Sequence, residues 1–311
     1  MFGRKIAPEY WANPNLRSSV MRNVLRHPLV QAFVLLIGVL AIFFILQAAV
    51  AAAFRIGPDN LTPANGLLLG LTGAVAALAT VALARRWEGA SMAGLGLPSR
   101  HAVPHLFAGI AVGGAIQAVA FGIMAAEGWY TVSTATVDLG SLTLMALTAL
   151  CVGFWEEWAF RGVALRLPEQ AVGTWWALVI SSLLFGLLHA PNGNASPMTL
   201  VGIAVAGGLV LGGGFLLTRS LWLPIGLHIG WNFVQNSVFG TSSSGAGTIK
   251  ETPLLRGHVN GPELWVGHPG DLESGLILIL VGTTTGLILL ALAVRAGHIR
   301  PTRRKTRTTT V

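Results

Sequence analysis

Charged residues and cysteine are scarce in this sequence. Only 10% of the 311 residues are charged and a single residue is cysteine, whereas soluble domains carry about 25% charged residues. The low charge excludes an ordinary soluble domain. One cysteine excludes an intrachain disulfide bond and any metal site built from cysteine ligands.

Apolar residues are abundant instead, and they occur in long runs. Hydrophobic residues make up 53% of the chain, and the mean hydropathy is +0.67. A helix that spans a bilayer needs about 20 apolar residues. About eight stretches have this character: 29–54, 64–84, 105–126, 141–160, 173–190, 198–217, 222–239 and 275–294. We therefore predict an all-α fold, a polytopic bundle of about eight transmembrane helices that forms one membrane-embedded domain over residues 29–295.

The basic residues follow the predicted topology. If the amino terminus is cytoplasmic, seventeen of the 20 Lys and Arg residues fall in cytoplasmic segments and three on the other side, the bias expected of membrane proteins. Residues 1–28 and 296–311 are then a basic cytoplasmic leader and a basic cytoplasmic tail, the latter touching anionic lipid. We expect no nucleic-acid partner. The Gly-, Ala- and Arg-rich composition suggests a bacterial cell membrane.

The longest connection between predicted spans covers about residues 240–274. It is rich in Ser, Gly and Pro and contains His258 and His268, so we predict an exposed loop with solvated histidines.

Ionisable side chains within apolar runs are the main functional signal. Each costs about 2.5–3.5 kcal/mol on insertion scales, so such residues are functional candidates. Of the 12 acidic residues only Glu156 and Glu157 lie within a predicted span. Of the eight histidines only His189 and His228 lie within apolar sequence, and the other six lie outside the spans or at their edges. Two acids and two histidines are thus placed on three different helices.

Helical spacing gives these candidates partners. Glu157 and Arg161 are four residues apart, so they share one helix face and can neutralise each other. Glu156 is rotated by about 100° from Glu157, which leaves it free to face a polar cavity within the membrane.

The two histidines have neighbours at the same spacing. Asn232 follows His228 by four residues, and Phe185 precedes His189 by four. An imidazole and an amide therefore project from one face of one helix, while an aromatic ring stands beside the other imidazole.

A carboxylate and two imidazoles in a desolvated cavity suit the activation of water for attack on an amide. Asn232 is a neutral donor that suits an oxyanion. Glu156, His189 and His228 also suit an open zinc site. The residues alone leave open whether the water is bound to zinc or activated directly.

At these positions the sequence resembles the CPBP family of intramembrane proteases, which includes the type II CAAX prenyl endopeptidases and bacterial Abi-type proteins. The family pattern is matched in order and on separate spans by Glu156-Glu157 with Arg161, by Phe185 with His189, and by His228 with Asn232. The match covers about residues 141–239.

The resemblance implies a helical bundle with an intramembrane active-site cavity. It implies that Glu156 and His189 activate water, and that His228 and Asn232 stabilise the oxyanion. Glu157 and Arg161 would support the site. The family is often described as metalloproteases, which keeps zinc as an open expectation. The expected partners are the lipid bilayer and a membrane-associated peptide or protein substrate, such as a bacteriocin precursor or a regulatory protein.

Two alternatives and one geometric conflict accompany this interpretation. A non-catalytic scaffold or immunity protein could use the same fold, and a secondary transporter could use the same residue types. Straight spans with the limits above would also place His189 near the far end of its helix and His228 near the inner end of its own. The helices must then tilt or break, or the predicted limits must shift.

Overall fold

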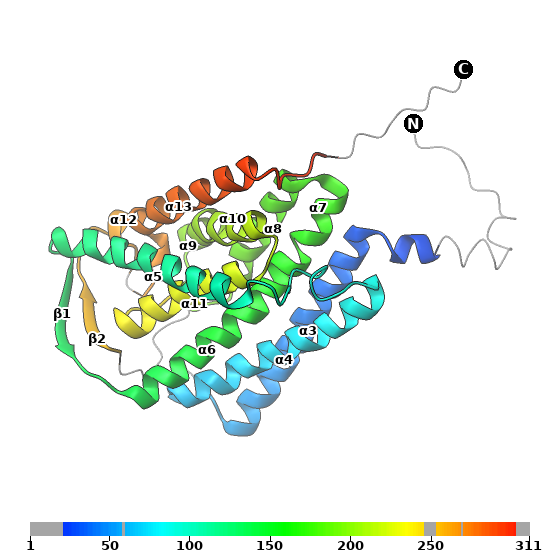
Figure 1. Ribbon diagram of the computed structural model, residues 1–311. Coiled ribbons are helices and arrows are strands. Elements are labelled where there is room, and N and C mark those ends of the chain that lie inside the picture. The colour runs from blue at the N-terminus through cyan, green and yellow to red at the C-terminus, as the bar shows by residue number, and fades with distance from the viewer. Residues whose placement is uncertain (1–20, 58–59, 246–252, 269, 303–311) are drawn as a thin grey trace, which may run out of the picture.

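The computed structural model describes residues 21–57, 60–245, 253–268 and 270–302. Most of the predicted leader, residues 1–20, and the end of the predicted tail, residues 303–311, lie outside the described residues. The described chain is almost entirely helical, which confirms the predicted fold class (Figure 1).

The long helices are joined by short connections, one pair of strands and several short helical turns. The α-helices are α3 (Pro28–Phe54), α4 (Pro63–Glu88), α5 (Ala102–Ala126), α6 (Leu139–Glu157), α7 (Arg166–Val172), α8 (Thr174–Leu188), α9 (Pro197–Gly202), α10 (Gly208–Thr218), α11 (Trp222–Phe233), α12 (Glu263–Val266) and α13 (Leu276–Arg295). The strands are β1 (Tyr130–Ala135) and β2 (Leu255–Val259). The turns are π-helical over Trp158–Val163, Ile203–Gly207 and Val234–Val238, and 3₁₀-helical over Leu272–Ser274.

Figure 1 shows the helices as a bundle around α6 and α11. The helices α3 and α4 form an antiparallel pair on one side, and α13 runs beside α10 on the other. The strands lie at one end of the bundle, while the start of α3, the helix α7 and the end of α13 lie at the opposite end.

Six helical segments are long and apolar enough to cross a membrane: Pro28–Phe54, Pro63–Glu88, Ala102–Ala126, Leu139–Val172, Pro197–Thr218 and Leu276–Arg295. The remaining two predicted spans are shorter than expected. The stretch 173–190 forms the 15-residue helix α8, and 222–239 forms the 12-residue helix α11 followed by a π-helical turn. The six long apolar helices make the chain an integral membrane protein. The two shorter segments carry His189 and His228.

Contacts between connections agree with the predicted path of the chain. The antiparallel pairing of β1 with β2 joins the connection after α5 to the connection before α13. At the other end of the bundle, Arg166 forms an ion pair with Glu88, and Arg219 with Glu169. Both groupings are those that eight crossings would bring to the same side.

The prediction of an exposed loop over residues 240–274 is wrong for part of that segment. Its two histidines, His258 and His268, are exposed as expected, but Asp271 and Glu273 are buried. The segment folds back against the helices through β2 and the turn before α13, and this tertiary packing covers side chains that a Ser/Gly-rich composition places in solvent.

Glycines bring α11 against α5. A Cβ at Gly226 would overlap the backbone carbonyl oxygen of Leu106, and one at Gly230 would overlap that of Ile110. In lipid the hydrophobic effect does not drive helices together, so their association depends on close packing. Small residues at this spacing allow the two backbones to approach closely. The backbone of α11, which carries His228, is therefore fixed by contact with α5.

Specific contacts fix both ends of the helix α6. The Asp138 side chain accepts hydrogen bonds from the backbone N–H groups of Gly140 (3.0 Å) and Ser141 (3.1 Å), as an N-cap does. After its last residues the chain enters a π-helical turn, and the indole N–H of Trp158 donates to Thr80 Oγ1 of α4 at 2.9 Å. These contacts place the carboxyl end of α6 in the middle of the bundle.

Candidate active site

Three helices bring the ionisable residues together. Glu156 and Glu157 are the last residues of α6, His189 caps the end of α8, and His228 lies within α11. All four side chains are buried. The π-helical turn directly after Glu157 adds a residue to a helical turn, a feature frequent at functional sites.

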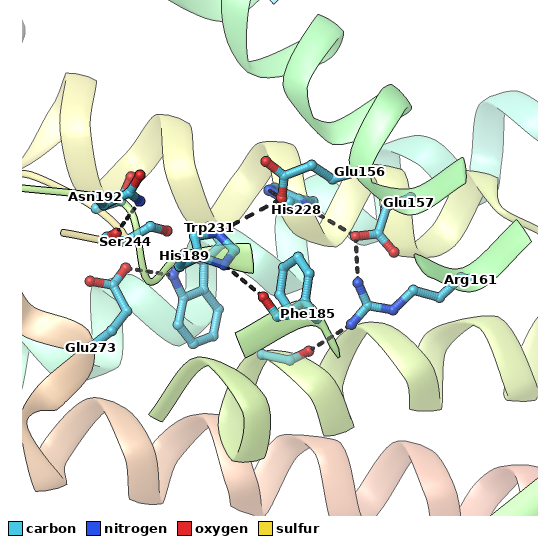
Figure 2. A network of polar contacts seen from close by, with 12 residues as sticks. Glu156, Glu157, Arg161, Phe185, His189, Asn192, His228, Trp231, Ser244 and Glu273 are labelled. Atoms are coloured by element: carbon cyan, nitrogen blue, oxygen red, sulfur yellow. Dashed lines mark hydrogen bonds and ion pairs between the residues drawn. The ribbon is translucent and has the colours of Figure 1, made fainter. Parts of the chain in front are cut away.

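The Glu157 carboxylate contacts two cationic or imidazole groups at once. Its Oε1 accepts from Arg161 Nη1 at 3.0 Å and contacts His228 Nδ1 at 2.9 Å (Figure 2). Glu157 and Arg161 are 0% and 1% exposed, so their charges are compensated only by each other and by this network. The expected pairing of Glu157 with Arg161 is present, and Glu157 also orients His228, a contact that spacing did not predict.

Glu156 faces the other nitrogens of both imidazoles. Its Oε2 lies 4.0 Å from His189 Nε2 and 3.7 Å from His228 Nε2. This oxygen is buried and has no hydrogen-bond partner among the described residues. A buried acceptor without a partner is costly, so the arrangement favours a donor between Glu156 and the two rings.

The tautomer of neutral His189 follows from its backbone contact. His189 Nδ1 lies 2.8 Å from the carbonyl oxygen of Phe185, and a carbonyl can only accept, so Nδ1 carries the proton. In the neutral ring Nε2 is then an acceptor. Two acceptors, His189 Nε2 and Glu156 Oε2, stand 4.0 Å apart, a separation that one bridging water molecule can serve by donating to both.

Phe185 forms an aromatic wall beneath the site. Its ring meets the rings of His189 and His228 edge to face, with centroids 5.0 and 6.1 Å apart. The Arg161 guanidinium carbon lies 4.4 Å from the Phe185 centroid, and Arg161 Nη2 donates to the Gly207 carbonyl at 3.4 Å. Figure 2 shows the ring between the histidines and Arg161. The wall limits how far either imidazole can turn.

The conflict between the heights of the two histidines disappears in the structure. His189 ends a helix of only 15 residues, and His228 lies mid-way along α11. Both therefore reach the carboxyl end of α6. The helix α8 ends there because Pro191 follows, and residues before a proline disfavour helical backbone.

A large cavity, with room for a solvent volume of about 360 Å³, opens on the site and is called the main cavity. Glu156, His189 and the partly exposed Asn232 line it. On its α3 side the Phe43 ring stacks on Trp155 at 4.3 Å. Asn232 and the Glu156 carboxylate thus line the same cavity, where the Asn232 amide can meet a bound group.

A smaller cavity, with room for a solvent volume of about 30 Å³, is lined in part by His228 and is called the side cavity. It shares Asn232 and Ser244 with the main cavity, and its lining includes Trp231 and Glu273. Burial, with the nearby Asp271 carboxylate, raises the pKa of Glu273 to about 7.

Sequence reasoning missed Glu273, Ser244 and Asn192. The Asn192 amide donates to the Ser244 carbonyl at 2.6 Å and thereby fixes part of the boundary between the cavities. The only sequence signal for Glu273 is its position directly before the last apolar run, at a place where an acid would ordinarily be solvated.

The zinc expectation rests on Glu156, His189 and His228. Their donor types suit zinc, and each histidine has its other nitrogen bonded to an oxygen, as metal ligands do. The residues that the structure describes nevertheless contain no group of three or more His, Cys, Asp or Glu side chains arranged to hold a metal ion.

Residues 138–234 match the sequence model of the family described as type II CAAX prenyl endopeptidase Rce1-like. The matched region begins at the N-cap of α6 and ends just beyond α11, so it contains every predicted site residue. No curated protein matches the chain.

Proposed function

We propose, on the premise that residues 138–234 carry a CPBP-family protease domain, that the chain is an intramembrane endopeptidase. Its substrate would be a peptide or protein held in the membrane. Glu156 and His189 would activate the water, and His228 and Asn232 would stabilise the oxyanion. The observation that carries this proposal is the convergence of His189 Nε2 and His228 Nε2 on the unpartnered Glu156 Oε2.

The first step is attack by water. A water molecule held between His189 Nε2 and Glu156 Oε2 gives one proton to the Glu156 carboxylate as its oxygen bonds to the substrate carbonyl carbon. The carbonyl π electrons move onto the carbonyl oxygen. The product of this step is a tetrahedral oxyanion and a protonated Glu156.

The second step is collapse of the tetrahedral intermediate. The Asn232 amide donates to the oxyanion, and a doubly protonated His228 donates from Nε2 while Glu157 accepts from Nδ1. Glu156 then transfers its proton to the amide nitrogen as the C–N bond breaks. The products are a carboxyl terminus and an amino terminus, with Glu156 restored to the ionised form.

Cleavage of quenched-fluorescence peptides by purified protein in detergent tests the proposal. Glu156→Gln keeps the size of the side chain but removes the base, so we expect a loss of about 10²-fold or more in kcat. Glu127→Gln, at an exposed position after α5, is the matched control and should keep the wild-type rate. Equal cleavage by the Glu156→Gln protein would refute the assignment.

The same experiment separates protease from scaffold. A scaffold or immunity protein would keep its full biological function in cells that carry Glu156→Gln, whereas a protease would lose it. A proteome comparison of these cells with wild-type cells should show missing peptide termini from membrane-associated substrates.

Zinc remains a separate proposal with its own measurement. If Glu156, His189 and His228 hold zinc, a chelator should abolish cleavage, and metal analysis of the purified protein should find about one zinc ion per chain. Full cleavage by protein shown to be free of metal would exclude a zinc requirement.

A further inference from the structure

The side cavity combines apolar walls with a carboxylate. Ile203, Leu211, Leu278 and Ile279 contribute to its apolar lining, and Glu273 is its acidic residue. An acidic side chain in such surroundings loses hydration and needs a compensating partner.

Glu273 is only partly compensated. The Trp231 indole N–H approaches its Oε1 at 3.5 Å, as Figure 2 shows, and backbone hydrogen bonds from Ser244 and from Glu273 itself also reach the carboxyl group. Its Oε2 is buried and has no hydrogen-bond partner among the described residues, and the same is true of Oδ1 of the nearby Asp271. The second Asp271 oxygen is bonded to Thr199. One wall of the side cavity thus carries the buried Glu273 carboxyl group, and the buried Asp271 carboxyl group lies close to it.

The side cavity shares lining residues with the main cavity and borders the site. His228 and Asn232 line it, and Asn232 and Ser244 line both cavities. A peptide whose scissile carbonyl meets Asn232 therefore has a side chain next to that bond at the entrance of the side cavity.

We propose that Glu273 is a specificity-determining residue that selects a lysine or arginine side chain next to the scissile bond. The aliphatic stem would pack on the apolar walls. The cationic end would meet the Glu273 carboxylate in a charge-assisted hydrogen bond, beside the Trp231 ring. This inference rests on the proposed function, because the position of the peptide is taken from Asn232.

Peptide binding tests the inference without requiring hydrolysis. In detergent-solubilised full-length Glu156→Gln protein, an apolar host peptide with a fluorescent label carries one lysine, moved one position at a time. Each lysine peptide is paired with a norleucine peptide, which has a similar stem but no ammonium group. At one position we expect the lysine peptide to bind about 10- to 100-fold more tightly, the range for a hydrogen bond to a charged group.

Variants then assign the preference to Glu273. Adding Glu273→Gln should reduce the lysine-to-norleucine ratio to near one, because it removes the charge that the ammonium group would meet. Glu263→Gln, on the same connection but exposed, is the matched control and should keep the ratio. If Glu273→Gln does not fold, the ratio measured without it still decides whether a cation is preferred.

The outcomes separate this inference from the proposed function. Equal binding of lysine and norleucine peptides at every position overturns the inference, and so does a lysine preference that survives Glu273→Gln. A serine or tyrosine peptide that binds as tightly as the lysine peptide would also overturn it, in favour of a neutral donor. Absence of hydrolysis by the wild type refutes the protease assignment but leaves the binding ratio measurable.

Discussion

At the scale of single residues, the Glu157 carboxylate has two functions that can be measured separately. It compensates the buried Arg161 guanidinium and it holds His228 Nδ1. The first contact bears on the free energy of unfolding, because an unpaired buried charge is costly. The second bears on catalysis, because it sets which His228 nitrogen faces Glu156.

Replacing Glu157 by glutamine should therefore lower both stability and rate. We expect the free energy of unfolding to fall by about 3–5 kcal/mol, the cost of breaking a buried pair. We expect kcat to fall by about 10- to 100-fold, the usual effect of losing a residue that orients a site imidazole. Thermal unfolding and peptide cleavage measure the two effects.

A second substitution distinguishes the two functions. In the Glu157→Gln, Arg161→Met double variant the uncompensated charge is gone, so most of the lost stability should return while the rate stays low. Recovery of the rate together with stability would show that Glu157 acts on folding alone.

The pH dependence of lysine-peptide binding follows from Glu273. Its pKa is raised to about 7, mainly by burial, opposed by hydrogen bonds from Ser244 and Trp231 and increased by Asp271. The carboxylate is therefore largely neutral below that pH and ionised above it, while lysine stays protonated up to about pH 10. The lysine-to-norleucine affinity ratio should rise as pH increases through about 7.

The contribution of Glu273 to the free energy of unfolding changes with pH in the opposite direction to lysine binding. The pKa of Glu273 in the folded protein, about 7, exceeds the ordinary glutamate pKa of 4.5, so the native state binds the proton more tightly than the unfolded chain does. Its contribution to stability is present at low pH and is lost as pH rises from about 4.5 through about 7. A lysine preference that does not change over this range would contradict the assignment of the carboxylate.

Some residues of the candidate site could be found from the sequence and others could not. Glu156, Glu157, His189 and His228 stand out because charge and polarity are costly in long apolar runs. Glu273 does not, because it lies in a connection of ordinary loop composition, and its burial arises from the way that connection folds onto the bundle. The contact from Glu157 to His228 is likewise a product of helix packing, 71 residues apart along the chain.

At the scale of elements, the close packing of α5 and α11 is the feature that fixes His228 and Asn232. Gly230→Ala would place a methyl group against the Ile110 carbonyl oxygen, which cannot move without its helix. We expect a loss of about 1–3 kcal/mol in stability, typical of overpacking, together with a lower cleavage rate because α11 is displaced.

Gly122 on α5 provides the control for this substitution. A Cβ at Gly122 meets nothing within 4 Å, so Gly122→Ala should keep the rate and leave stability unchanged or slightly improved by helix propensity. Equal effects of Gly122→Ala and Gly230→Ala would show that backbone approach is not the cause.

Element type was more predictable than element length. Hydropathy located all eight helical stretches, because each is a long run of apolar residues, whether it faces lipid or the interior of the bundle. It did not show that α8 stops at Leu188 or that α11 turns π-helical after Phe233. Those limits depend on Pro191 and on packing, and they are what bring the two histidines to the same depth.

At the scale of the whole molecule, the predicted orientation of the chain can be tested at the two ends of the bundle. Thr134 on β1 and Thr302 after α13 are both exposed. The strand β1 and the end of α13 lie at opposite ends of the bundle in Figure 1. The distribution of basic residues predicts a cytoplasmic position for Thr302.

Cysteine labelling in intact cells measures this orientation. A membrane-impermeant thiol reagent should label Thr134→Cys in intact cells and Thr302→Cys only after permeabilisation. The unmodified chain, with Cys151 alone, gives the background. Labelling of both positions in intact cells would contradict the eight-crossing path.

The pairing of β1 with β2 also sets the order in which the protein matures. During synthesis β1 emerges long before its partner strand, and domains are built from the amino terminus onward. Glu156, His189 and His228 precede β2 and Glu273 along the chain. If these residues have the roles proposed above, a growing chain acquires its water-activating residues first and the wall of its side cavity last, and it reaches full selectivity only when its synthesis is nearly complete.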